Sequence, residues 1–312
     1  LISYYDIVSV ENLLAAWKEF LPGKRNKRDV QFFARDLMGN IIQLHGDLVN
    51  LTYQHAGYES FNISDPKPRH IHKASVKDRL LHHAIYRKLY PFFDRKFIAD
   101  SYSCRMNKGT HRALKRFQML TRQVSRNNTK TCWVLQCDIR QFFASIDQAT
   151  LVRILEQYIS DKRIMWLLEN IIGSFSLEPG KGLPLGNLTS QLFVNVYMNE
   201  FDQFMKHHIK VKQYIRYADD FVILSCSKEN LVSLIAPITE YLDNSLKLSL
   251  HPKKTKIKTL ASGIDFLGWV HFPYHRVLRI TTKRRMLRRI YQRPKEETYQ
   301  SYLGLLKHGN AH

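Results

Sequence analysis

The sequence is poor in cysteine, and the few that it has are scattered. They are Cys104, Cys132, Cys137 and Cys226 in a chain of 312 residues. The pair Cys132 and Cys137 lacks the two-residue gap that is typical of a zinc knuckle. We therefore predict buried free thiols in a reducing cytoplasm, and neither a disulfide scaffold nor a zinc site.

Long apolar runs are also missing. No segment approaches the roughly 20 consecutive apolar residues of a membrane-spanning helix, and no basic amphipathic segment stands apart. The first nine residues lack the basic, apolar and small-residue layout of a secretory signal. Internal repeats and low-complexity segments are absent as well. These absences predict a cytoplasmic protein with no visible targeting segment and no membrane partner.

Acidic residues are scarce relative to basic ones. The chain has 48 Lys and Arg against 27 Asp and Glu, which gives a formal net charge of +21 and a pI near 9.8. Such a charge attracts polyanions, and nucleic acid fits it better than a membrane surface does. The hydrophobic content of 44% is that of a globular protein, and the length favours two or three packed subdomains.

Hydrophobic periodicity and turn residues predict alternating helices and strands. We expect helices over residues 1–60, 76–98, 148–172 and 189–206, and a basic helix from Thr281. We expect strands at 69–72 and 132–139, two strands across 213–225, and a hairpin near 264–280. Basic loops are predicted around 24–28 and 251–258, and a glycine-rich loop at 180–186.

Three aspartates stand in an unusually apolar setting. Asp138 ends the strand predicted at 132–139, and Asp219 and Asp220 lie in the tight turn between two apolar strands. Phosphoryl transfer to a nucleotide commonly uses two Mg²⁺ ions roughly 3.5–4 Å apart, held by a few carboxylates and the substrate phosphates. Two other interpretations stay open at this point: Asp-Asp as ordinary turn chemistry, and Asp138 as the cap of a following helix.

The aspartates belong to three motifs in a fixed order. The motifs run from Asp138 to Asp147 (DIRQFFASID), from Tyr217 to Asp220 (YADD), and from Phe266 to Trp269 (FLGW). They resemble the first catalytic motif, the metal-binding hairpin and the primer-gripping motif of reverse transcriptases. The resemblance covers nearly the whole chain and implies an RNA-directed DNA polymerase that uses two Mg²⁺ ions and dNTP substrates.

Further segments resemble one branch, the reverse transcriptases of diversity-generating retroelements. Where most relatives have Gln-Gly, three residues and Ser-Pro, this chain reads LGNLTSQ from Leu185 to Gln191. The segments PKPR at 66–69, KDRL at 77–80, SYSCR at 101–105 and SYLGLLKH at 301–308 also fit that branch. It implies a bacterial or phage enzyme that copies a template-repeat RNA, misincorporates opposite adenines, supports mutagenic retrohoming and binds a small basic pentameric accessory protein.

The resemblance implies an α+β right-hand polymerase fold with fingers, a palm of antiparallel sheet and helices, and a helical thumb. We predict an N-terminal helical extension at 1–63, fingers at 64–131, a palm at 132–275 with a fingers insertion around 150–182, and a thumb at 276–312. Alternatives are a retron, group II intron or anti-phage defence reverse transcriptase, and a non-catalytic RNA-binding scaffold with a polymerase-like fold.

The same resemblance assigns roles to individual residues. Asp138 and Asp219 are expected to bind metal, with the backbone carbonyl of Ile139 as a further ligand and Asp220 in support. Nucleotide contacts are expected from Arg105, Phe143, Leu185, Gly186, Gln191 and Lys254. Primer and template contacts are expected from Arg69, Lys108, Phe266, Leu267, Gly268, Trp269, Arg284 and Arg288.

For four of these residues, a specific chemical role is expected. Arg105 would grip the triphosphate through its guanidinium, the alternative being an exposed basic residue on an RNA-binding face. Phe143 would block a ribose 2′-hydroxyl, the alternative being a core phenylalanine like Phe142. Leu185 offers only shape where accurate relatives have glutamine, or it packs on the core as a loop leucine. Lys254 would stabilise the leaving pyrophosphate.

Overall fold

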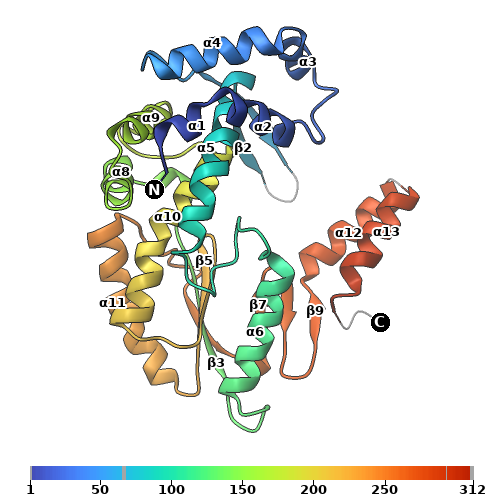
Figure 1. The fold of residues 1–312 in the computed structure, drawn as a ribbon. Helices are drawn as coiled ribbons and strands as arrows, with labels where there is room; N and C mark the ends of the chain where they lie inside the picture. Colours follow the sequence, from blue (N-terminus) through green and yellow to red (C-terminus); the bar gives the residue numbers. More distant parts are fainter. Residues whose placement is uncertain (1, 65–67, 293, 310–312) are drawn as a thin grey trace. The chain divides into compact units, whose positions relative to one another are not determined.

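A computed structural model describes residues 2–64, 68–292 and 294–309. Contacts between residues divide the chain into two units. The first comprises Leu1–Ile98, Gln141–Asp202 and Asp243–Leu248, and the second comprises Ala99–Arg140, Gln203–Leu242 and Ser249–His312. Both units combine helices with strands, so the mixed class predicted from the sequence is confirmed (Figure 1).

The first unit is mainly helical. Its elements are α1 (Tyr4–Val8), α2 (Val10–Phe20), α3 (Arg28–Arg35), α4 (Leu37–Val49), β1 (Tyr58–Ile63), β2 (Arg69–Ala74), α5 (Val76–Asp94), α7 (Phe142–Ser145), α8 (Gln148–Glu156), α9 (Lys162–Gly173) and α10 (Leu188–Gln203). Helix α2 packs against α5 and buries Leu13, Trp17 and Phe20. Ser75 caps α5, because its hydroxyl accepts the backbone N–H of Asp78 at 3.2 Å.

The second unit contains two antiparallel sheets. Its elements are α6 (Thr110–Val124), β3 (Trp133–Asp138), the π-helical turn Phe204–His208, β4 (Tyr214–Tyr217), β5 (Asp220–Ser225), α11 (Lys228–Leu246, which ends in the first unit), β6 (Lys256–Thr259), the 3₁₀ turn Leu260–Ser262, β7 (Ile264–Phe266), β8 (Trp269–His271), β9 (Arg276–Leu278), α12 (Ile280–Gln292) and α13 (Glu296–Leu306). The larger sheet has the order β4-β5-β3-β6 and the smaller one β7-β8-β9. Helix α6 packs against β4 and β5.

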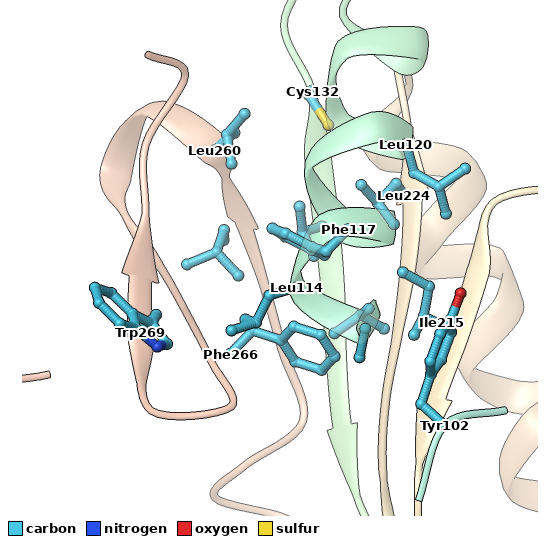
Figure 2. Packing of buried hydrophobic residues seen from close by; sticks show 14 of the residues in the cluster. Tyr102, Leu114, Phe117, Leu120, Cys132, Ile215, Leu224, Leu260, Phe266 and Trp269 are labelled. Carbon is cyan, nitrogen blue, oxygen red and sulfur yellow. The ribbon is translucent and has the colours of Figure 1, made fainter. Parts of the chain in front are cut away.

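One hydrophobic cluster joins the two sheets of the second unit to α6. Leu114 and Phe117 of α6 point toward Phe266 and Trp269 of the smaller sheet (Figure 2). The rings of Phe117 and Phe266 lie 5.2 Å apart. Ile215 of β4 belongs to the same cluster. Burial of this apolar surface fixes the sheet that carries the predicted catalytic aspartates.

Several predicted elements are corrected by the structure. The helical prediction for residues 1–60 holds only to Val49, since Tyr58–Ile63 forms β1. The helix expected over 148–172 is two helices, because Asp161 caps α9 by accepting the N–H of Arg163 at 2.9 Å. The basic loop at 251–258 contains the start of β6, whose residues alternate between exposed and half-buried as in an edge strand. The α-helical part of 189–206 ends at Gln203.

The prediction of four buried thiols is wrong for two of them. Cys132 and Cys137 are buried in β3 or beside it, whereas Cys104 and Cys226 are exposed. Cys104 lies in a turn with a positive φ of 52°, and Cys226 follows the last residue of β5. Both positions are loops, where the apolar character of cysteine does not decide burial.

Some predicted features fall outside the described residues. They are Pro66 and Lys67 of the PKPR segment, Leu1, and Arg293 of the basic helix. Within the described ranges, no helix is both long and apolar enough to cross a membrane.

Candidate active site

Two of the three predicted catalytic aspartates face each other on neighbouring strands. Asp138 is the last residue of β3 and Asp220 is the first of β5, and the antiparallel register pairs them directly. Residues paired in this way project to the same side of the sheet. The side chain of Asp220 hydrogen-bonds to that of Asp138, which is 7% exposed. The predicted alternative for Asp138 is wrong, because the cap position of the following helix α7 is Gln141.

The third aspartate lies in the turn that joins β4 to β5. Tyr217 pairs with Asp220, so the turn between them consists of Ala218 and Asp219 alone. The backbone carbonyl of Asp219 accepts the N–H of Ile139 at 3.3 Å. The turn is therefore tied by its main chain to the residue that follows Asp138. Asp220 belongs to the strand and not to the turn in which we expected it.

Ala218 adopts a left-handed conformation, with φ at 55°. Glycine adopts this conformation freely, whereas for alanine it costs roughly 1 kcal/mol. Such a conformation persists only where the surroundings hold it.

A buried arginine that the sequence reasoning missed holds this turn. Arg216 of β4 is fully buried and donates from Nη1 to the carbonyl of Ala218 at 3.1 Å. Its Nη2 donates to Oγ of Ser101 at 3.1 Å. The available signal was a lone charged residue inside the apolar run YIRY. A buried charge needs fixed partners, and here one of them is the backbone of the predicted catalytic turn.

The chain before α6 extends the edge of this sheet. Backbone hydrogen bonds join Arg216 N–H to the carbonyl of Asp100 and Tyr102 N–H to the carbonyl of Arg216, each at 3.0 Å. Arg116 of α6 grips the carboxylate of Asp100 with two hydrogen bonds, of 2.9 and 3.0 Å. The segment around Ser101 is therefore anchored on both sides.

Two predicted binding residues lie on the loop that leaves this segment. Arg105 donates from Nη1 to the carbonyl of Ser101 at 3.0 Å. Lys108 donates from Nζ to the carbonyl of Ala99 at 2.7 Å and lies over the ring of Tyr102. Arg105 is half-buried, and this burial does not distinguish a triphosphate contact from a place on an RNA-binding face. Its role toward a triphosphate stays a prediction.

Lys254 lies against the acidic pair. Its Nζ is 2.8 Å from Oδ1 of Asp138, although nearly half of the lysine side chain is exposed. The loop that carries it is fixed to β3, since His251 N–H donates to the carbonyl of Asp138 at 2.7 Å. Lys254 N–H then closes a turn on the carbonyl of His251 at 3.0 Å. We expected Lys254 near a pyrophosphate, and the structure places its ammonium on a predicted metal ligand.

The electrostatics of the pair are those of a site with excess negative charge. Burial, the hydrogen bond to Asp138 and the charges of Asp219 and Asp138 together raise the pKa of Asp220 to about 8. Lys254 acts in the opposite direction. Two carboxylates held together in this way cannot both ionise at low cost unless a cation joins them.

The donor set fits Mg²⁺ in part. Carboxylate and carbonyl oxygens are the hard ligands that this ion prefers. Within the described part of the chain, no three acidic, histidine or cysteine side chains group closely enough to hold an ion alone. Mg²⁺ in such sites is completed by waters and substrate phosphates, so Asp138 and Asp220 supply a partial site of the expected kind.

Five predicted binding residues lie in the first unit and are described there alone: Arg69, Phe143, Leu185, Gly186 and Gln191. The carbonyl of Leu185 accepts the N–H of His72 of β2 at 3.1 Å. Gly186 has φ at 118°, and a Cβ there would lie 3.1 Å from Ile71 Cγ2. The loop is thus built against β2, the strand that begins at Arg69. Gln191 lies in α10 and is half-buried.

Phe143 also belongs to the first unit. It lies in the short helix α7, half-buried, and its ring meets that of Phe142 edge-on at 5.6 Å. Its carbonyl accepts the N–H of Leu183 at 2.9 Å. Phe142 is buried, as predicted.

The primer-gripping motif forms the β7–β8 hairpin of the second unit. Phe266 and Trp269 are buried in the hydrophobic cluster (Figure 2), while Leu267 and Gly268 turn between them with φ of 50° and 87°. Any contact between this motif and a primer must therefore be made by the turn residues Leu267 and Gly268. Arg284 and Arg288 are exposed on α12, four residues apart and so on one face.

Comparisons with known proteins agree with this geometry. The profile of the family described as "Reverse transcriptase (RNA-dependent DNA polymerase)" matches residues 64–271. The chain is 26% identical over 272 residues to Protein YkfC of Escherichia coli, covering 75% of this chain and 69% of that protein. It is 23% identical over 260 residues to the group II intron-encoded protein LtrA of Lactococcus lactis, covering 62% of this chain and 42% of that protein.

Solved structures share the fold. The apo telomerase of Candida tropicalis, truncated from its C-terminal domain, aligns with a TM-score of 0.53 and 12% identity over 75% of this chain and 59% of that one. The telomerase of Candida albicans, solved with a fragment of telomeric RNA, also gives 0.53 over 73% and 46%. These likenesses agree with the predicted right-hand polymerase fold. The family profile covers more than half of the sequence, and the chain therefore belongs to the reverse transcriptase family of RNA-dependent DNA polymerases.

Proposed function

We propose that this chain copies RNA into DNA at the site formed by Asp138, Asp219 and Asp220. The observation that carries the proposal is the direct pairing of Asp138 with Asp220, next to a turn that is tied to β3. The charge of +21 supports a polyanionic template and primer. The telomerase structure with RNA and the intron-encoded relative support RNA as the template.

The ions would be held by the carboxylates of Asp138, Asp219 and Asp220, together with the carbonyl of Ile139. When bound, two Mg²⁺ ions activate a 3′-hydroxyl and neutralise the charge that develops on the phosphate. Asp220 must give up its proton for such binding, since its raised pKa keeps it protonated near neutral pH. The ammonium of Lys254 neutralises the charge of the Asp138 carboxylate. When a metal ion replaces it there, this ammonium becomes available to a phosphate group of the substrate.

Primer extension tests this function. Wild-type protein should extend a DNA primer on an RNA template with dNTPs, and Asp219→Ala should abolish extension while leaving template binding intact. A wild type that binds RNA but never extends a primer would support the alternative of a non-catalytic RNA-binding scaffold.

We infer that fingers, palm and thumb follow the predicted bounds of 64–131, 132–275 and 276–312, after a helical extension at 1–63. Exposed Arg284 and Arg288 on α12 would lie along the backbone of the template and primer, because phosphates take most such contacts. Extension and binding should then weaken steeply with salt.

Within this family, we propose a diversity-generating role, with a template-repeat RNA and a small basic accessory protein as partners. The support is the LGNLTSQ loop and the other segments of that branch. Leu185 lies in a loop built on β2, and it offers only shape where a glutamine could hydrogen-bond to a nascent base pair. Sequenced cDNA from the wild type should show errors concentrated at template adenines.

A second candidate is an intron-type or other bacterial reverse transcriptase without mutagenic specialisation. The similarity to the group II intron-encoded protein favours it. The match covers only 42% of the length of that protein. An intron-type activity of this chain, with its RNA and DNA substrates, is therefore proposed and not inferred from the match alone. An error spectrum evenly spread over the four template bases would favour this candidate.

A further inference from the structure

A polar cavity lies in the second unit and is built from other elements than the acidic pair. It has a volume of about 240 Å³. Its polar lining comes from Gln118 and Thr121 of α6, His271, His275 and Arg276 of the β8–β9 hairpin, and Lys307 and His308 after α13. Among the described residues that line it, none is acidic.

Two buried polar atoms at this cavity have no hydrogen-bond partner within the described ranges. They are Nε2 of His271 and Nη1 of Arg276. The two residues pair directly across β8 and β9, and His271 is 4% exposed. A buried polar atom without a partner costs about 1–3 kcal/mol, and such atoms are usually satisfied by an ordered water, an ion or a bound ligand.

The protein holds the Arg276 guanidinium firmly in place. Its Nε donates to the backbone carbonyl of His308, and its plane lies over the ring of Trp269, 5.4 Å from the centroid. Burial lowers the pKa of Arg276, yet an arginine stays charged in proteins. No described residue that lines the cavity supplies a carboxylate to pair with it. A fixed, half-buried guanidinium whose Nη1 is buried and without a partner among the described residues is complementary to an oxyanion.

His271 determines which hydrogen-bonding group the ligand must offer on its side of the cavity. Burial lowers its pKa to about 4, so the ring is neutral near pH 7. The ring interacts with the backbone of Phe266, whereas its Nε2 has no hydrogen-bond partner within the described residues, and in a neutral ring whose proton is on Nδ1 this nitrogen is an acceptor. The ligand must therefore accept from Arg276 and donate to His271. A phosphate group that carries one proton does both.

We propose that this cavity is a binding site for a single phosphate group, either inorganic phosphate or the terminal phosphate of a nucleic acid strand. Arg276 donates hydrogen bonds to its oxygens, Nε2 of His271 accepts a hydrogen bond from its hydroxyl group, and Lys307 adds positive charge at the rim. The proposal of this phosphate site does not depend on the proposed polymerase reaction, and the two can be tested separately.

Calorimetric titration of the full chain with sodium phosphate, at ionic strength held constant with chloride, tests the proposal. The wild type should bind phosphate saturably and gain thermal stability from it. Arg276→Met should weaken the apparent affinity about tenfold or more, the loss of one charge-assisted contact. Arg122→Met, which removes an exposed arginine of α6, should bind like the wild type. No saturable binding by the wild type, or equal binding by Arg276→Met, would overturn the proposal.

Sulfate gives a test that needs no variant. Sulfate has the shape and charge of phosphate but no proton to donate near neutral pH, so it should bind several-fold more weakly. Equal affinities for the two anions would overturn the role given to His271.

Oligonucleotides identify the source of the phosphate group. Competition by a 5′-phosphorylated strand and not by its 5′-hydroxyl counterpart assigns the site to a strand end. Competition by neither strand assigns it to inorganic phosphate. Equal competition by both strands would overturn the proposal, because it points to backbone phosphodiesters.

Discussion

Arg216 donates a hydrogen bond to the carbonyl of Ala218, and this bond fixes the turn that joins β4 to β5 and contains Asp219. The guanidinium is fully buried and also bonds to Ser101, so the turn is connected to the segment before α6. Ala218 is left-handed, and the arginine supplies the contact that keeps it so. Arg216 is thus a positioning residue for Asp219 and Asp220.

Replacing Arg216 should impair polymerisation through the geometry of the turn. Arg216→Met removes the buried charge together with its hydrogen bonds to Ala218 and Ser101, each worth about 1.5–3 kcal/mol, and should lower the unfolding free energy as well as kcat. Arg216→Lys keeps the charge without the two-pronged geometry and should fold better, yet lose kcat about tenfold or more. Steady-state extension kinetics and urea unfolding measure both effects.

A purely structural role would predict a different result for Arg216→Lys. Its kcat and its half-saturating Mg²⁺ concentration would then match those of the wild type wherever the variant is fully folded. That outcome would contradict the positioning role.

The acidic pair predicts how Mg²⁺ binding depends on pH. The pKa of Asp220 is raised to about 8, so below pH 8 a proton competes with the ion for this carboxylate. The half-saturating Mg²⁺ concentration should fall up to about tenfold per unit as pH rises from 6 to 8, and then level off. Titration of extension rates against Mg²⁺ at each pH measures it.

Asp220→Asn is the matched variant for the pH experiment, since an amide does not titrate. It should bind Mg²⁺ more weakly and lose most of the pH dependence. If the variant keeps the slope of the wild type, another group titrates and the assignment to Asp220 fails.

Acid should destabilise the fold through a buried histidine. Burial lowers the pKa of His82 to about 3, against about 6.5 in an unfolded chain. Between these values the unfolded state binds more protons, so the unfolding free energy falls as pH is lowered from about 6.5 toward 3. This histidine alone contributes a slope of up to about 1.4 kcal/mol per pH unit.

The variant His82→Gln should flatten this acid dependence, and His207→Gln, at an exposed position, should leave it unchanged. Denaturant unfolding at several pH values measures both. An equally steep decline in His82→Gln would show that other groups control acid unfolding.

The predicted role of Phe143 in excluding ribonucleotides can be tested by substitution. If its half-buried ring excludes a 2′-hydroxyl, Phe143→Ala should incorporate ribonucleotides about tenfold or more readily relative to deoxynucleotides. Competitive incorporation of matched rNTP and dNTP pairs measures the ratio. Undiminished discrimination in the variant would place the gate elsewhere and leave Phe143 as a packing residue.

Fidelity can be tested at Leu185. Leu185→Gln restores an amide that could hydrogen-bond near the nascent pair, and it should lower the error rate at template adenines several-fold. Sequencing of cDNA made by both proteins on one RNA measures the change. An unaltered error spectrum would discard the explanation that rests on this side chain.

The acidic pair could be predicted from the sequence because each of its aspartates lies at the end of a recognisable apolar strand. Asp138 and Asp220 end and begin strands whose apolar runs are legible, and antiparallel pairing then brings them together. The contact between Lys254 and Asp138 was not predictable, since four lysines crowd that loop and only its folding onto His251 selects one. Side-chain partners across distant loops are set by tertiary packing.

Arg216 was missed for a related reason. A single arginine within four strand residues suggests a solvent-facing edge position, and its burial depends on Asp100 and Ser101, which are more than a hundred positions earlier. Strand β6 was missed because lysines at every second position resemble a solvated basic loop. The exposed thiols Cys104 and Cys226 lie at turns whose burial no local pattern reveals.

Counting of bound metal tests the central claim most directly. Electron paramagnetic resonance with Mn²⁺ as the probe should find two ions per chain in a complex of wild-type protein, RNA template, DNA primer and dNTP. Asp138→Asn and Asp219→Asn should each lose at least one ion and fail to extend the primer. Two ions in both variants, or none in the wild type, would contradict the assignment of these carboxylates as the metal site of a polymerase.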